Sequence, residues 1–136
     1  MGIPNYAPTL ESELTRPFYE GLAQGELRIT ANARTGEWVW YPPESIPGHS
    51  QDELVWKPVS PDGTVYTFTT VVRSLLPGDH SEETPFTVIL FESDDAPGAR
   101  VPGLLLGDDT PKCGMRVRFQ PLKVGDHHIA AFTPIG

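Results

Sequence analysis

The chain has 136 residues, which is enough for one domain with a hydrophobic core of its own. Its formal net charge of -8 at pH 7 argues against a nucleic-acid partner, because affinity for phosphates comes mainly from lysine and arginine. The single cysteine, Cys113, excludes an intramolecular disulfide and a cysteine-rich metal cluster. No apolar run approaches the ~18 residues of a membrane span, and the first residues lack a signal-peptide pattern, so we expect a cytoplasmic protein without membrane association.

The first segment predicts a disordered lead over residues 1–8 and then one or two short helices within 9–25. Pro17 suits a first helical turn, Phe18, Tyr19 and Leu22 share one face, and Gly25 is a stop signal. Residues 1–25 are therefore predicted to be a lead and helix.

Residues 26–58 predict a small β-ribbon. Strand signals cover 27–30, 37–42 and 52–59, with a turn at 34–36 and a loop rich in proline, serine and glycine between the last two.

Residues 59–136 predict a five-stranded β-barrel of the OB type, and the whole chain is mainly β. Five strand signals recur between loops rich in glycine, proline and aspartate, at 64–73, 85–93, 100–107, 114–122 and 128–135. The doubled steps Thr69-Thr70 and Val71-Val72 indicate a bulge that turns a barrel corner. The apolar run 86–91 favours a strand buried on both faces.

An ordered set of short motifs covers nearly the whole chain. They are Pro17–Leu22 followed by Gly25-Glu26-Leu27, Tyr41-Pro42-Pro43, Leu54-Val55-Trp56 with Val59-Ser60, Gly63–Thr69, and Gly114–Phe119. In this set the chain resembles the acyl-CoA-associated OB-fold proteins, a family long filed as a domain of unknown function. The resemblance implies an N-terminal helix, a rubredoxin-like zinc ribbon and an OB barrel.

The zinc positions depart from the family pattern. The resemblance implies two Cys-x-x-Cys pairs, and the matching positions here are Asn32, Thr35, Pro47 and Ser50. None of these residues replaces a thiolate well, so we expect a degenerate ribbon without metal. Packing of Trp38, Trp40 and Trp56 is the expected substitute for the metal.

The resemblance also implies a role. Such proteins look like accessory subunits of thiolase-superfamily enzymes (thiolases, acyltransferases or retro-aldolases of steroid side-chain breakdown), or are fused to acyl-CoA hydratases. The partner would supply the catalytic residues and this chain none, a heterotetramer is the expected assembly, and a coenzyme A thioester is the expected substrate of the complex. The chain itself would bind no cofactor. The expected partner contacts, several of which the chain's own core would also use, are Phe18, Tyr19, Leu22, Trp38, Trp40, Tyr41 and Trp56.

Two alternatives remain open. Arg73, Arg116 and Arg118 can meet the phosphates of coenzyme A, which would suit a stand-alone acyl-CoA or small-ligand binding module, although ordinary surface ion pairs explain them equally well. Cys113 with His127 or His128 would suit a self-sufficient enzyme. No nucleophile elbow, phosphate loop or metalloprotease motif is present, so we do not expect the chain to be an enzyme alone.

Overall fold

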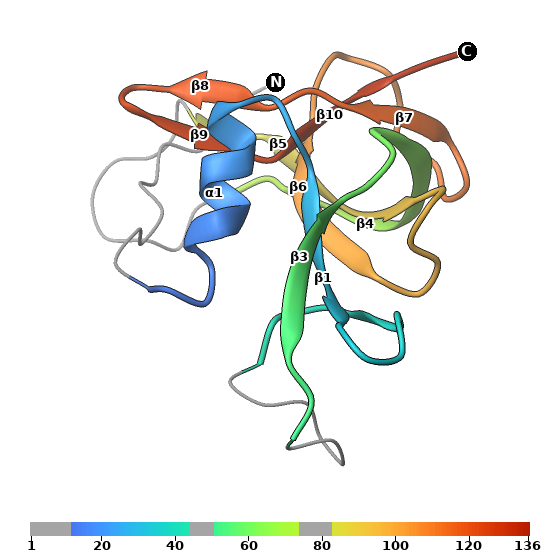
Figure 1. The fold of residues 1–136 in the computed structure, drawn as a ribbon. Helices are drawn as coiled ribbons and strands as arrows, with labels where there is room; N and C mark the ends of the chain where they lie inside the picture. The colour runs from blue at the N-terminus through green and yellow to red at the C-terminus, as the bar shows by residue number, and fades with distance from the viewer. Residues whose placement is uncertain (1–11, 44–50, 74–82) are drawn as a thin grey trace.

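The structure is a computed structural model that describes residues 12–43, 51–73 and 83–136. These residues form one helix and three sheets (Figure 1). The elements are α1 (Arg16–Ala23), β1 (Arg28–Asn32), β2 (Trp38–Val39), β3 (Leu54–Pro58), β4 (Asp62–Val71), β5 (Phe86–Ser93), β6 (Arg100–Leu105), β7 (Arg116–Phe119), β8 (Leu122–Val124), β9 (His127–Ile129) and β10 (Ala131–Pro134).

The main body is a closed barrel with strand order β10-β6-β5-β4-β7. Its neighbouring strands are antiparallel, except that β6 and β10 run parallel. The fully buried rings of Phe91 and Phe132 stack inside it with centroids 4.3 Å apart. The predicted fold class, a mainly β chain with a helix and a five-stranded OB barrel, is confirmed.

The barrel differs from the prediction in two details. The bulge lies at Tyr66, where the register between β4 and β5 shifts between Val65 and Thr67, and not at the doubled Thr69-Thr70 or Val71-Val72 steps. Strand β5 is not buried on both faces: burial alternates along it, so one face is buried and the other is only half-buried. The apolar run was misleading because Phe86, Val88 and Leu90, on the outward face of β5, are apolar although they are only half-buried.

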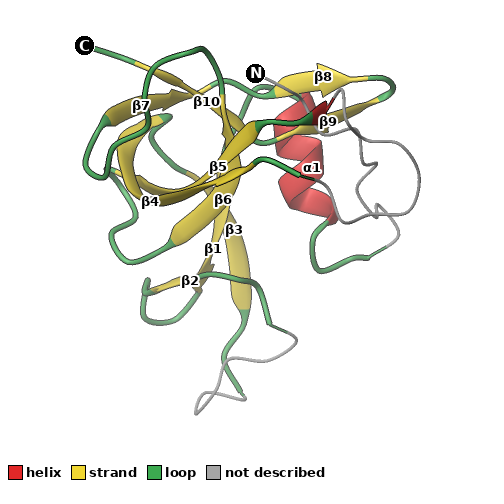
Figure 2. Cartoon of the chain, turned by 180° about the vertical axis from the view of Figure 1, so that it is seen from behind, coloured by secondary structure: helices red, strands yellow, loops and turns green. Residues whose placement is uncertain are grey.

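The sequence pattern missed the β8–β9 hairpin. The register pairs Leu122 with Ile129 and Val124 with His127, and Gly125 adopts a positive φ of 62° in the turn. The motif Val-Gly-Asp-His was the available signal for this two-residue turn. In Figure 2 the hairpin lies beside α1.

The second sheet, with order β2-β1-β3, projects away from the barrel as the predicted ribbon (Figures 1 and 2). The register sets Trp56 of β3 opposite Thr30, and Trp38 of β2 opposite Ala31. Because successive side chains of a strand point to opposite faces, Trp56 and Trp38 lie on opposite faces of this sheet.

Candidate partner-binding surface

The helix is closed at its C-terminal end by backbone geometry. Gly25 adopts φ +76°, and the N–H groups of Gly25 and Glu26 donate to the carbonyl oxygens of Leu22 and Gly21, at 3.1 and 2.8 Å. This is a Schellman arrangement, which ends a helix where a glycine accepts the left-handed conformation. A side chain at Gly21 would approach the Glu26 carbonyl oxygen at 2.6 Å, so the tight closure also requires glycine there.

Arg28 of β1 fastens the helix to the ribbon. Its guanidinium donates to the Pro17 carbonyl oxygen at 3.2 Å, to the Gln24 amide oxygen at 3.1 Å and to the Glu26 carboxylate at 2.6 Å. One side chain therefore contacts both the first turn and the end of α1, which fixes the helix face relative to β1. The sequence analysis did not single out Arg28.

Five aromatic rings meet where α1 faces the ribbon. Phe18 lies with ring centroids 5.3 Å from Tyr19, 5.3 Å from Trp40 and 6.5 Å from Trp56. Trp40 in turn lies 5.7 Å from Tyr41 and 6.2 Å from Trp56. We call Phe18, Tyr19, Trp40, Tyr41 and Trp56 the aromatic cluster. The centroid separations are those of favourable aromatic pairs.

The aromatic cluster runs from the core to solvent. Phe18 is 8% exposed, Tyr19, Trp40 and Trp56 are half-buried, and Tyr41 is 59% exposed. Burial raises the pKa of the Tyr19 hydroxyl, and neighbouring Tyr41 adds to the rise, so the Tyr19 phenol stays neutral at pH 7. The outer part of the cluster is therefore formed by aromatic side chains that remain partly accessible to solvent.

The other two predicted contacts do not join the aromatic cluster. Leu22 is 1% exposed and belongs to the core, so it offers no surface to a partner. Trp38 packs against the core from the other face of the ribbon. The structure thus brings five of the seven predicted contact residues together.

Two of the three predicted phosphate-binding arginines, Arg116 and Arg118, are held in ion pairs. Arg116 donates to both oxygens of Asp94 at 2.8 and 2.7 Å, and Arg118 donates to both oxygens of Asp62 at 2.7 and 3.2 Å. These hydrogen bonds lower the pKa of Asp94 and Asp62 and raise the pKa of both arginines. The bidentate positions that a phosphate would use are thus occupied by carboxylates.

Arg73 lies away from the other two arginines. It is exposed and lies two residues beyond the end of β4, whereas Arg116 and Arg118 pair with Thr64 and Asp62 near the start of that strand. The structure does not bring the three together at one site.

Of the predicted zinc positions, Pro47 and Ser50 lie outside the described residues. Asn32, the last residue of β1, is 2% exposed, and Thr35 is exposed in the tight turn that follows. Asn32 and Arg34 both bond to Asp52, which the sequence analysis did not connect with this turn. An acidic residue next to the second zinc pair was the available signal.

The residues of the self-sufficient enzyme alternative are placed as follows. Cys113 is exposed in the turn before β7, and His127 is half-buried in β9.

Across the described parts of the chain, no group of three or more histidine, cysteine, aspartate or glutamate side chains is arranged to hold a metal ion. Within those same ranges, no helix has both the length and the apolar character to cross a bilayer.

Comparison with known proteins finds a family that covers most of the barrel. Residues 56–120 match the family described as the C-terminal OB-fold domain of ChsH2. Over these residues the chain is similar to ChsH2-type OB-fold domains. The family resemblance predicted from the sequence is thereby confirmed, while the loss of zinc stays a prediction. No curated protein matches the chain in sequence.

Two solved structures share the fold over nearly the whole chain. A chain of the Ltp2-ChsH2(DUF35) aldolase is similar with a TM-score of 0.78 at 21% identity, over 94% of this chain and 98% of that chain. A DUF35 family protein of unknown function from Sulfolobus solfataricus is similar with a TM-score of 0.60 at 11% identity, over 93% of this chain and 89% of that one. At these identities the likeness establishes the fold, including the helix and ribbon that precede the barrel.

Proposed function

We propose that this chain is a non-catalytic accessory subunit of a thiolase-superfamily enzyme that acts on acyl-CoA thioesters, with a retro-aldolase as the preferred partner. The observation that carries the proposal is the likeness to a chain of the Ltp2-ChsH2(DUF35) aldolase, because it extends through helix, ribbon and barrel alike. The ChsH2-type domain at residues 56–120 supports the same role.

The aromatic cluster is the proposed docking surface. Tyrosine and tryptophan are enriched in protein interfaces because they bury much area at little entropic cost. Trp40, Tyr41 and Trp56 keep exposed surface at the junction of α1 and the ribbon, and Phe18 supports them from the core. Arg28 holds the two elements in register. This surface is therefore preorganised, which reduces the free energy of ordering on binding.

The arginines favour a partner role over a stand-alone ligand-binding role. Phosphate binding by Arg116 or Arg118 would require breaking a bidentate ion pair with Asp94 or Asp62. Direct contact with coenzyme A is thus assigned mainly to the partner enzyme, with exposed Arg73 as the candidate contribution of this chain.

The test is co-expression with a thiolase-like protein encoded in the same genomic neighbourhood, or with an acyl-CoA hydratase encoded there. Size-exclusion chromatography with light scattering gives the assembly, and thiolysis and retro-aldol assays on acyl-CoA substrates give the activity. A heterotetramer whose activity is absent from either chain alone is the expected result. Separate elution of the two chains, or saturable acyl-CoA binding by this chain alone, would contradict the proposal.

A further inference from the structure

The tip of the ribbon lacks the chemistry of the zinc site that the family resemblance implies. Zinc in structural sites takes thiolates, imidazoles or carboxylates. Asn32 offers an amide whose oxygen already accepts the N–H groups of Arg34 and Thr35, at 2.8 and 3.2 Å. The Thr35 hydroxyl is neutral and accepts the N–H of Glu37 at 3.2 Å. The two described positions therefore do not fit a zinc ion.

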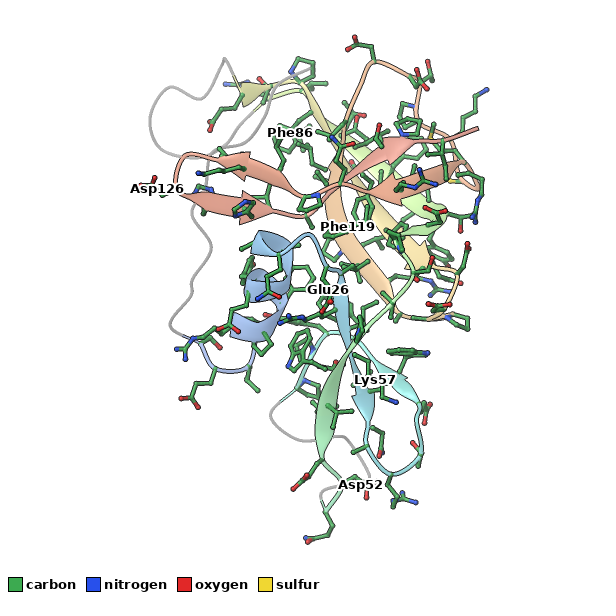
Figure 3. The ribbon with its side chains drawn as sticks, turned by 45° about the horizontal axis from the view of Figure 1, so that its top comes forward. Glu26, Asp52, Lys57, Phe86, Phe119 and Asp126 are labelled. Atoms are coloured by element: carbon green, nitrogen blue, oxygen red, sulfur yellow. The ribbon has the colours of Figure 1, made fainter. Side chains whose placement is uncertain are left out.

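A different set of contacts ties this turn to the segment that leads into β3. The Asn32 amide nitrogen donates to Asp52 Oδ2 at 3.0 Å. The Arg34 guanidinium donates to both oxygens of the same carboxylate, each at 2.8 Å. In Figure 3, Asp52 lies at the end of the ribbon that is far from the barrel.

We propose that this Asn32–Arg34–Asp52 network takes the place of the metal and makes the folding of the ribbon independent of zinc. The network joins residues that are 20 apart in the sequence, as a metal bound between two loops would. Closing a loop of this length removes conformational freedom from the ribbon, whichever chemistry makes the link.

Each member has a separate part in the network. The Asn32 side chain holds the turn, which Gly36 completes with φ +77° and an N–H bond to the Asn32 carbonyl oxygen at 2.8 Å. The Asp52 side chain is only 11% exposed, so its paired hydrogen bonds are partly shielded from water. Asparagine suits position 32 because its amide donates to Asp52, whereas an aspartate there would repel it.

The inference is independent of the proposed function and is tested on the full-length chain. Metal content is measured by mass spectrometry after expression with added Zn²⁺, and amide hydrogen exchange is followed at residues 32–36 with and without EDTA. We expect less than about 0.1 zinc per chain and no effect of EDTA on exchange. About one zinc per chain, with faster exchange after its removal, would overturn the inference.

Substitutions test the network itself. D52A is expected to speed exchange at the amides of Arg34, Thr35 and Gly36 by about tenfold or more, because the turn loses its tie to β3. R118A removes a bidentate ion pair of the same kind on the barrel and is the matched control, with unchanged exchange at the ribbon tip. If D52A does not fold, N32D replaces it in the same exchange experiment. This variant keeps the side-chain oxygen that accepts the N–H groups of Arg34 and Thr35, but it loses the N–H group that donates to Asp52. Unchanged exchange in the folded variant would contradict the network.

Discussion

Phe18 and Tyr41 are joined through the ring of Trp40, yet one belongs to the core and the other to the surface. The centroid of Trp40 lies 5.3 Å from that of Phe18 and 5.7 Å from that of Tyr41. Phe18 is 8% exposed and Tyr41 is 59% exposed. Substitutions at the two positions should therefore separate folding from partner binding, although both belong to one aromatic cluster.

The first prediction concerns Tyr41. Y41A is expected to weaken assembly with the partner enzyme by about 2 kcal/mol, roughly thirtyfold in Kd, as for a central aromatic contact. The thermal midpoint of the isolated chain should stay close to that of wild type, because the side chain is largely in solvent. Titration calorimetry and thermal unfolding measure the two quantities.

Tyr66 provides the matched control for Tyr41. It is 50% exposed and lies on the barrel with the Arg100 guanidinium 3.7 Å from its ring centroid. Y66A should leave assembly unchanged if the aromatic cluster is the docking surface. Equal weakening by Y41A and Y66A, or none by Y41A, would argue for a different surface.

The second prediction concerns Leu22, which sequence analysis grouped with the contacts. It is 1% exposed, so L22A is expected to lower the free energy of unfolding by about 2–5 kcal/mol through the cavity it leaves. Urea unfolding of the isolated chain measures the loss. A variant with unchanged unfolding but impaired assembly would place Leu22 at the interface after all.

Much of the fold could be predicted from local signals, and the errors have physical reasons. Alternating strands between turn residues indicated the barrel, and Pro17 and Gly25 bracketed the helix. The bulge at Tyr66 could not be located, because the register is decided by pairing with β5 rather than by the sequence of β4. The sequence also could not distinguish core from surface among aromatic residues.

The residue types of the candidate site could be predicted from the sequence, but the ion pairs between its charged side chains could not. Aromatic residues at the helix and ribbon were identified as contact candidates because large aromatic side chains are enriched at interfaces. The ion pairs of Arg116 with Asp94 and of Arg118 with Asp62 join residues 22 and 56 positions apart, so no local pattern reveals them. These ion pairs determine whether the guanidinium groups of Arg116 and Arg118 are available to bind a phosphate.

The third prediction concerns acyl-CoA binding by the barrel arginines. If Arg116 is committed to Asp94, R116A should leave the affinity of the assembled complex for acyl-CoA unchanged within about twofold, since the guanidinium is not available to phosphate. R73A tests, in the same assay, the one of the three predicted phosphate-binding arginines for which no ion pair was described above. A tenfold or greater loss with R116A would instead favour a direct role in binding coenzyme A.

The fourth prediction concerns pH. The pKa values of Asp62 and Asp94 are lowered from their ordinary value of 3.8, chiefly by hydrogen bonds from Arg118 and Arg116. The folded state therefore binds fewer protons than the unfolded state near that pH, so stability is fully present above pH 3.8 and is lost as the pH falls below it. Urea midpoints of wild type between pH 2.5 and 6 should decline more steeply below about pH 4 than those of D62N/D94N. R116A/R118A should show the same reduced slope, and parallel curves for all three proteins would contradict the assignment.

The last prediction concerns Gly63, the second residue of β4 in the barrel. It is buried beside β5, and a Cβ atom there would overlap the carbonyl oxygen of Glu92 and lie 2.7 Å from the Phe91 ring. Because Phe91 is fully buried and stacked on Phe132, the ring has no room to move aside. G63A is therefore expected to lower the free energy of unfolding by about 1–3 kcal/mol, the usual effect of overpacking a core. T67A, on an exposed position of the same strand, is the control and should change stability by less than about 1 kcal/mol. A stable G63A chain would mean that β4 and β5 are further apart at this point than the register of Gly63 with Ser93 requires.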